Sequence, residues 1–328
     1  MATALRLRLP LRAVGFLAVL AAAALAAALV PGAVSHAAPS SSDLTKQIKQ
    51  QSTKFDKLVE AYNKVTEERK DTQAKIKSLN AKIRTLTDDV ATGRKQVGEL
   101  AAEAYRGGTA SAWNSLLDGA GGNMVNGIAT LDRIGAHRSA QLKRLVAAGK
   151  KLNARRGELA DASAAQARQQ KDLAGKKSSI SDDIAHLKVL RKKAYGREQE
   201  TADAAGSAGP PPPVSGRAGT VVRFAYAQLG KPYVWAADGP DSYDCSGLTL
   251  AAWRQVGVNL PHLASAQYNQ IPHVTRSQAQ PGDLVFYEDL GHVAVYIGGG
   301  RVIHAPTFGE VVKVSSIDMM PVYGIGRP

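Results

Sequence analysis

The sequence predicts a chain in two parts: a long α-helical coiled-coil hairpin, then a C-terminal α+β domain whose helices pack on an antiparallel sheet. Only 5% of the 328 residues are aromatic, which is little material for a large globular core but suits long helices. Apolar residues recur in a heptad register over much of the first 200 residues. Beyond a proline-rich stretch, helical segments are followed by short apolar runs between glycine turns, which is an α+β pattern.

Residues 1–37 have the three parts of a secretory signal peptide. A positive start with Arg6, Arg8 and Arg12 precedes an apolar run at 14–30, and small residues then lead to Ala37, after which we expect cleavage. An uncleaved membrane anchor is the alternative, but a run of 17 residues is at the short edge for crossing a bilayer. We therefore expect a secreted protein.

From about Ser42 to Tyr105 the apolar residues follow alternating steps of three and four, which predicts a coiled coil rather than a lone amphipathic helix. At 1.5 Å per residue this helix would be about 90 Å long. Arg69, Thr72 and Gly93 interrupt the seam. The seam residues are Ile48, Phe55, Leu58, Tyr62, Val65, Ile76, Leu79, Ile83, Leu86, Val90, Val97, Leu100 and Ala104.

Glycine-rich segments at 107–108 and 118–122 interrupt the helix, and a second, weaker heptad run follows. Two matched helices joined by a turn can fold back as an antiparallel hairpin; pairing between two chains is the alternative. His137 and His186 have no partner at metal-ligand spacing, so we expect them to be solvated. The second run comprises Ile128, Leu131, Leu142, Leu145, Leu152, Leu159, Leu173, Ile180, Ile184 and Leu187.

Residues 201–216 contain four consecutive prolines and predict an extended, semi-rigid linker. The expected divisions are a signal peptide at 1–37, a helical hairpin at 38–200, this linker, and a C-terminal domain at 217–328. Within that domain we predict helices at 218–229 and 245–256, and strands at 284–287, 292–297, 301–304 and about 311–314.

The charge is unevenly distributed along the chain. The formal net charge is +14, of which the segment 38–216 carries +11, whereas the segment from Arg217 to Pro328 is neutral. A basic stalk on an exported protein favours an anionic partner, either wall polymers or a lipid surface. The alternative is a solvated helix face whose charge only maintains solubility. Export argues against nucleic acid as a partner.

Cys245 is the only cysteine in the chain, so it cannot form an internal disulfide. It stands where a loop is predicted to become a helix. The N–H groups at a helix start lower the pKa of a thiol and can serve as an oxyanion hole. A small buried hydrophobe is the alternative reading of one cysteine, but two histidines downstream favour a nucleophile.

His292 begins a predicted strand, shares a face with Ala294, and precedes the turn Gly298–Gly300 that leads to His304. A two-residue turn would put the histidines on opposite faces, whereas a three-residue or bulged turn pairs Ala294 with His304 and puts both on one face. Glycines suit the positive φ of the longer turn. We therefore predict that form, with His292 as the general base for Cys245 and His304 fixing its tautomer. Taken singly, His304 also fits a structural role.

His262 and His273 complete a set of four histidines in this segment, which raises the question of a zinc site. Their spacing lacks a compact ligand pair such as H-x-x-x-H. We expect no metal and no cofactor.

The C-terminal segment resembles the NlpC-type cell-wall cysteine peptidases, and the match covers most of residues 218–328. The thiol motif alone is not specific, but several motifs in the order of the family are. These motifs are Gly230-Lys231-Pro232-Tyr233-Val234-Trp235, Asp244-Cys245-Ser246-Gly247-Leu248, Leu260-Pro261, Pro281-Gly282-Asp283-Leu284, Gly291-His292-Val293 and Ile303-His304-Ala305.

The resemblance implies a papain-like fold and hydrolysis of peptidoglycan stem peptides, with the bond between D-glutamate and the diamino acid as the expected target. It implies Cys245 as nucleophile, His292 as base and His304 as the orienting third residue. The order of signal, helical rod, linker and peptidase is similar to that of actinobacterial wall endopeptidases that act in cell separation, so we expect association with the cell wall. Positions that border the substrate groove of the family are matched by Tyr233, Asp244 and Ser246.

Two departures from the pattern of the family affect the expected shape of the groove. Ala236-Ala237 stand where two glycines are common, and His262 stands where an arginine commonly follows the Leu-Pro pair. The expected nucleophile and base are not affected.

Two other functions remain open from the sequence. One is an amidase or acyltransferase on the same fold, and the other is a non-catalytic coiled-coil scaffold or activator that binds the wall. For regulation, one hypothesis is that the basic hairpin folds over the groove and keeps the enzyme inactive until a protein partner moves it.

Overall fold

The computed structural model describes residues 40–106, 124–205 and 209–328. Residues 40–328 form one compact unit. The predicted signal peptide and the predicted glycine-rich hairpin tip lie outside the described residues. Among the residues that are described, no helix is both long enough and apolar enough to cross a membrane.

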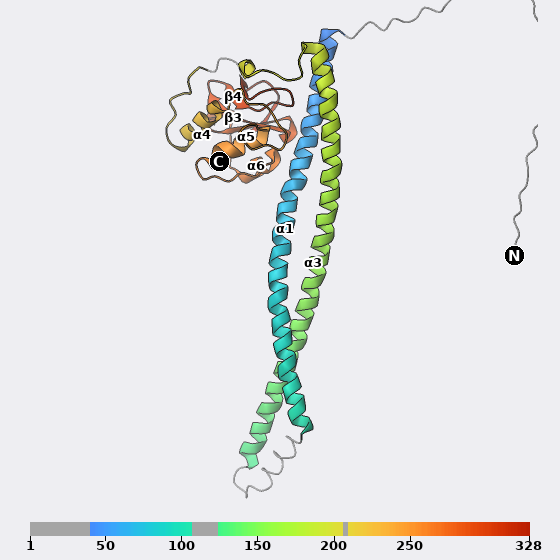
Figure 1. Ribbon diagram of the computed structural model, residues 1–328. Helices are drawn as coiled ribbons and strands as arrows, with labels where there is room; N and C mark the ends of the chain where they lie inside the picture. Colours follow the sequence, from blue (N-terminus) through green and yellow to red (C-terminus); the bar gives the residue numbers. More distant parts are fainter. Residues whose placement is uncertain (1–39, 107–123, 206–208) are drawn as a thin grey trace, which may run out of the picture. The chain divides into compact units, whose positions relative to one another are not determined.

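Two long helices make up the first part of this unit, α1 (Ser41–Tyr105) and α3 (Met124–Tyr195). They run side by side (Figure 1). The Gln51 side chain donates to Asp183 at 2.8 Å and that of Gln169 donates to Thr72 at 3.2 Å. Early residues of α1 thus face late residues of α3, so the helices are antiparallel. This confirms a hairpin formed within one chain.

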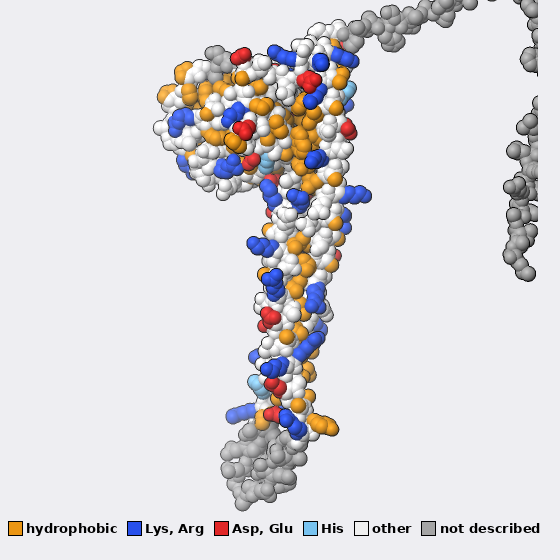
Figure 2. Space-filling model, viewed as in Figure 1, with side chains coloured by type: hydrophobic (Ala, Val, Ile, Leu, Met, Phe, Trp, Pro, Cys, Tyr) orange, Lys and Arg blue, Asp and Glu red, His pale blue; other side chains and the backbone are white. Residues whose placement is uncertain are grey.

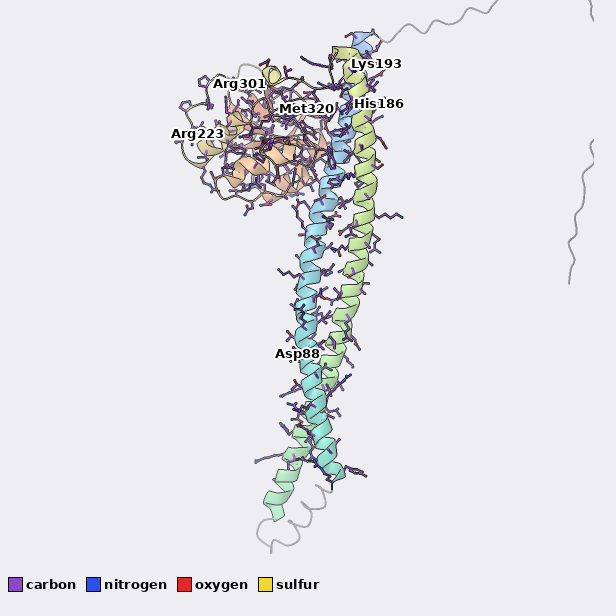
Figure 3. All side chains as sticks on the ribbon, viewed as in Figure 1. Asp88, His186, Lys193, Arg223, Arg301 and Met320 are labelled. Carbon is purple, nitrogen blue, oxygen red and sulfur yellow. The ribbon has the colours of Figure 1, made fainter. Side chains whose placement is uncertain are left out.

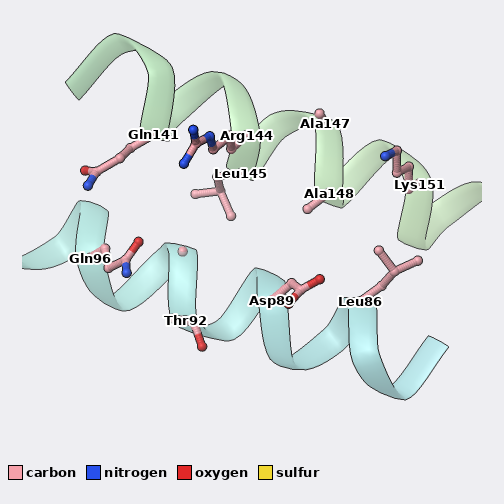
Figure 4. A pocket seen from close by; sticks show the side chains of 11 residues that line it. Leu86, Asp89, Thr92, Gln96, Gln141, Arg144, Leu145, Ala147, Ala148 and Lys151 are labelled. Carbon is pink, nitrogen blue, oxygen red and sulfur yellow. The ribbon is translucent and has the colours of Figure 1, made fainter. Parts of the chain in front are cut away.

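Two interruptions of the predicted seam have a structural reason. Thr72 accepts the hydrogen bond from Gln169 and so links the two helices by polar contact. A Cβ at Gly93 would stand only 3.1 Å from Leu145 Cδ1, so glycine leaves the space that this leucine fills. Figure 4 shows Leu145 directed at α1 within a cavity of about 520 Å³ between the helices.

Basic side chains project from the outside of the hairpin, next to hydrophobic side chains that are also exposed (Figure 2). Lys and Arg side chains are spread along the face seen in Figure 2, consistent with the basic composition of this segment. His186 and Lys193 belong to α3 (Figure 3). Both His137 and His186 are exposed, as predicted, and His137 contacts the Gln141 side chain on its own helix.

The C-terminal part is α+β, as predicted, with one six-stranded antiparallel sheet in the order β1-β6-β2-β3-β4-β5. Two of its helices, α4 and α5, pack against β3. The elements are η1 (Ala202–Ala205), α4 (Gly216–Ala227), α5 (Cys245–Arg254), α6 (Ala264–Gln270), β1 (His273–Val274), η2 (Arg276–Gln278), β2 (Leu284–Tyr287), η3 (Glu288–Leu290), β3 (His292–Gly298), β4 (Arg301–His304), β5 (Lys313–Ser316) and β6 (Val322–Gly326).

The sequence did not predict α6, β1 or β6, and it placed β5 two residues too early. Strand β6 has glycines at alternate positions, so it lacks an apolar alternation. Those glycines make room for neighbours: a Cβ at Gly324 would collide with the Tyr268 ring, and one at Gly326 with Ile271. The glycines of β6 are therefore explained by the packing of larger neighbouring side chains, not by an alternation of apolar and polar residues along the strand.

The core extends from the sheet into the hairpin. Buried side chains of β2, β3, α4 and α5 form one apolar cluster with side chains from both α1 and α3. Phe55 of α1 is fully buried, and its ring meets Tyr233 edge-on at 6.1 Å and Phe308 at 6.3 Å. Tyr62 meets Trp235 at 5.0 Å. Two residues that the heptad assigns to the seam therefore contact the C-terminal domain.

Candidate active site

Cys245 is the first residue of α5. The preceding Asp244 has an extended backbone, and its carboxylate accepts a hydrogen bond of 2.7 Å from the Gly247 N–H, which is an N-cap. The Val293 N–H hydrogen bonds to the Cys245 thiol. The thiol therefore lies at the start of β3, next to the position of His292.

Asp244 is fully buried and connects several segments around the thiol. Its Oδ2 accepts from the Ala236 N–H at 2.9 Å and from the Asn63 side chain at 3.2 Å. Its Oδ1 contacts His262 Nε2 at 2.8 Å. His262, which replaces the arginine common in the family, thus bonds directly to this carboxylate.

His292 and His304 meet as the register argument predicted. Val295 pairs with Ile303, which sets Ala294 opposite His304, and the register shifts between Tyr296 and Gly298. The bulged turn is therefore confirmed. His292 Nε2 lies 2.9 Å from His304 Nδ1, and the rings are nearly perpendicular.

Both imidazoles are buried, with 3% of His292 and 4% of His304 exposed. Burial lowers the pKa of His292 to about 4, although the charge of Asp244 opposes this. The pKa of His304 is also lowered, by burial first and then by the charges of His292 and Lys313. Both rings are accordingly neutral near pH 7, and a neutral ring can accept a proton.

The thiol differs from the sequence prediction. We expected the helix start to lower its pKa, but the pKa of Cys245 is raised, by burial first and then by the nearby carboxyl groups of Glu60, Asp244 and Asp56. Two of these three carboxyls belong to α1. Burial and the nearby carboxyls therefore outweigh the effect of the α5 N-terminus and favour the protonated thiol.

Helix α1 covers the site with polar as well as aromatic side chains. Glu60 is 9% exposed and accepts a hydrogen bond of 3.0 Å from the Ala264 N–H. Asp56 accepts one of 2.9 Å from the Thr307 hydroxyl. Beside it, a cavity of about 360 Å³ reaches both His292 and His304. The histidines are thus accessible from this side, whereas Cys245 is not among the residues that line the cavity.

The structure brings the predicted groove residues together around Cys245, in a covered state. Asp244 and Ser246 are fully buried, and Tyr233 is 3% exposed because the Phe55 ring lies against it. Ser246 donates to Asp244 at 3.3 Å. All three predicted positions are therefore in the region that α1 closes.

Sequence reasoning missed several residues of this region. Ser315 Oγ lies 2.8 Å from His304 Nε2. Gln267 is fully buried and its amide donates at 2.9 Å to the carbonyls of Ser246 and Pro261, which ties α5 to the Leu-Pro loop. A buried amide between two motifs carries no signature in a single sequence. Ser315 lies on β5, a strand that the sequence placed two residues too early.

The four histidines considered as zinc ligands do not converge. His262 bonds to Asp244, and His273 stacks on the Tyr268 ring at 3.8 Å. In the part of the chain that is described, no three or more His, Cys, Asp and Glu side chains gather as a metal site would require.

A thiol at a helix start, a histidine on an adjoining strand and a further polar residue behind that histidine make the arrangement of cysteine hydrolases. Residues 230–322 match the NlpC/P60 family, so this segment is an NlpC/P60 domain. The match confirms the family resemblance that the motifs carry.

Relatives are similar over this segment only. A probable endopeptidase of Mycobacterium tuberculosis is 41% identical over 109 residues, which is 33% of this chain but only 28% of that relative. The solved NlpC/p60 domain of the peptidoglycan hydrolase SagA is 36% identical and covers 34% of this chain and 98% of that chain, with a TM-score of 0.32. RipD of Mycobacterium tuberculosis, described as a non-catalytic NlpC/p60 domain protein adapted to peptidoglycan binding, is 28% identical and covers 35% of this chain and 98% of that chain, with a TM-score of 0.32.

Proposed function

We propose that this protein is a secreted, wall-associated cysteine endopeptidase that hydrolyses an amide bond of peptidoglycan stem peptides. The bond between D-glutamate and the diamino acid is its target in this proposal. The observation that carries it is the buried pair of His292 and His304, 2.9 Å apart, at the end of the sheet where the Val293 N–H meets the Cys245 thiol. The matched family and the names of relatives support endopeptidase activity, and the peptidoglycan substrate class follows from the family resemblance of the motifs.

In this mechanism His292 takes the proton of Cys245 while the sulfur attacks the carbonyl carbon of the substrate. N–H groups of the first turn of α5 stabilise the oxyanion. His292 then returns the proton to the leaving amine, and a thioester remains. Water, deprotonated by His292, hydrolyses the thioester and regenerates the thiol.

The proposal also includes latency. With α1 in place, the thiol is buried and its pKa is raised, and side chains of α1 lie against Tyr233 and Asp244. Hydrolysis therefore requires that α1 leave the groove. The proposed organisation has four parts: a signal peptide at 1–37, a regulatory hairpin at 38–200, a linker at 201–216 and a peptidase domain at 217–328. The basic hairpin is then the surface for anionic wall polymers, a membrane surface or a regulatory protein.

Digestion of purified peptidoglycan tests both parts. The chain from residue 38 and a shorter chain from residue 215 would each be compared with their Cys245→Ala variants, with released fragments identified by mass spectrometry. We expect fragments only with the thiol present, more of them from the shorter chain, and masses that identify the bond. Wall binding without fragments from any chain would instead support a scaffold. Equal yields from the long and short chains would refute latency.

A further inference from the structure

The neighbours of His304 determine which nitrogen of His292 is available to the thiol. His304 uses Nδ1 toward His292 at 2.9 Å and Nε2 toward the Ser315 hydroxyl at 2.8 Å. His304 pairs with Lys313 across β4 and β5, so Ser315 is its diagonal neighbour two residues further along β5. His292, His304 and Ser315 therefore form a row of three side chains, each within hydrogen-bond distance of the next, and the Cys245 thiol bonds to the residue after His292.

A neutral imidazole has one N–H and one lone pair, so the row has two arrangements. In the first, His304 donates from Nε2 to Ser315 and accepts at Nδ1 from His292, which leaves a lone pair on His292 Nδ1. In the second, Ser315 donates, every bond is reversed, and His292 Nδ1 carries a hydrogen. Only the first arrangement provides a base for Cys245.

The intermediate in which His292 is protonated requires the same tautomer of His304. Once His292 has taken the thiol proton, both of its nitrogens carry hydrogen, and its Nε2–H needs an acceptor. His304 Nδ1 is that acceptor only when the His304 hydrogen is on Nε2, where Ser315 receives it. In the other tautomer two N–H groups would face each other at 2.9 Å.

We propose that Ser315 is a positioning residue that accepts a hydrogen bond from His304 and thereby holds the His292–His304 pair in the tautomer that can deprotonate Cys245. This inference rests on the proposed thiol mechanism. A hydroxyl suits the role because it accepts a hydrogen bond without adding a negative charge that would favour a cationic His304. Ser315 also lines the cavity beside the histidines, so its own hydrogen can point to solvent.

The first measurement is the state of the ring nitrogens in the full chain labelled with ¹⁵N-histidine, read from long-range ¹H–¹⁵N correlation spectra. We expect wild type and Ser315→Thr to show His304 and His292 protonated on Nε2 only. Ser315→Ala should show a mixture of tautomers at His304. Ring-nitrogen signals that are unchanged in Ser315→Ala would overturn the proposal.

The second measurement is the alkylation rate of Cys245, the only cysteine, in the same full-length proteins. Loss of one hydrogen bond predicts a decrease of about threefold to tenfold in Ser315→Ala, with recovery in Ser315→Thr. In a His304→Asn background the Ser315→Ala change should have no effect, because an asparagine amide presents a fixed acceptor oxygen and has no tautomer. An equal decrease in both backgrounds would show that Ser315 acts only through packing.

Peptidoglycan digestion by these proteins separates this inference from the proposed function. If the tautomers and alkylation rates respond as expected, the role of Ser315 is supported. If in that case no variant releases wall fragments, the peptidase function is rejected. Fragments from all variants, with unresponsive ring nitrogens, would reject Ser315 and support the peptidase.

Discussion

The side-chain amide of Asn63 donates a hydrogen bond of 3.2 Å to the carboxylate of Asp244, although 181 residues separate the two in sequence. Asn63 is 2% exposed and Asp244 is fully buried. A residue of α1 thus donates to the carboxylate that caps α5. In the proposed latent state this contact is a polar anchor for α1, beside the aromatic contact of Phe55.

Removing that anchor should expose the thiol. We predict that Asn63→Ala accelerates alkylation of Cys245 about tenfold, because a hydrogen bond to a charged group is lost from the docked state only. The rate of iodoacetamide labelling at fixed pH measures this. Lys64→Ala is the matched control, since Lys64 is exposed on the same helix. Equal labelling rates in Asn63→Ala and wild type would show that this bond does not hold α1.

Docking of α1 should weaken as the pH rises. Burial raises the pKa of Glu60 to about 8, with the charges of Asp244 and Asp56 adding to the effect and the Ala264 hydrogen bond opposing it. Docked Glu60 therefore holds a proton that the undocked carboxyl releases near its ordinary pKa of 4.5. Docking is strongest below that value and weakens by up to about tenfold per pH unit until about pH 8.

Asp56 acts in the same direction, because its pKa is raised by burial and by the charges of Glu288, Glu310 and Asp244. The Cys245 thiol and the Tyr233 phenol also face these carboxyls, and the pKa of each is raised.

Comparing wild type with Glu60→Gln separates the effect of ionising the Glu60 carboxyl from the effect of ionising the thiol itself. The substituted amide is neutral at every pH and keeps an acceptor for the Ala264 N–H. We expect the ratio of wild-type to variant alkylation rates to rise between pH 5 and pH 8. Glu68→Gln, an exposed position on α1, should keep a ratio near one. Parallel profiles for wild type and Glu60→Gln would contradict the prediction.

Ala236→Gly should stabilise the protein. Ala236 has φ of 56°, in the left-handed region, and its N–H bonds to Asp244. Glycine removes the steric penalty there, so we predict a gain of about 1 kcal/mol, measured as a higher midpoint of urea or thermal unfolding. Ala237→Gly, whose φ is not positive, should instead lower the midpoint. A lower midpoint for both variants would show that position 236 is not strained.

Gly247→Ala should have the opposite effect at the nucleophile helix. An added Cβ would collide with the Ala237 carbonyl oxygen and stand 2.9 Å from His262 Nε2. We predict a loss of about 2–3 kcal/mol in the free energy of unfolding and loss of hydrolysis. Gly175→Ala is the control, because nothing lies within 4 Å of its added Cβ and alanine favours a helix. A Gly247→Ala variant as stable as wild type would disprove the close approach.

The sequence could place His292 and His304 because strand alternation and a glycine-only turn leave few registers for the pair. At Ala236 the family resemblance predicts the backbone but not the side chain: the backbone keeps the positive φ that glycine would suit, although the residue is alanine. Ser315 could not be placed, because it lies on β5, an edge strand of the sheet, and nothing in the sequence fixes the register of that strand.

The contacts of α1 were also beyond the reach of the sequence. A heptad states that Phe55 and Tyr62 are buried but not which surface buries them, and both meet aromatic rings of the NlpC/P60 domain. For the same reason the raised pKa of Cys245 could not be foreseen, since it depends first on burial in the fold and then on carboxyl groups, two of which belong to α1.

Helix α1 and the groove that it covers belong to one polypeptide, so the proposed inhibitor is always present in equal amount and on the order of millimolar effective concentration. Dilution therefore cannot activate the proposed peptidase, and opening follows first-order kinetics at any protein concentration. A cut in the proline-rich segment 201–216 would turn this internal equilibrium into a bimolecular one. The freed peptidase would then lose its inhibitor by diffusion, and activation would become irreversible in practice.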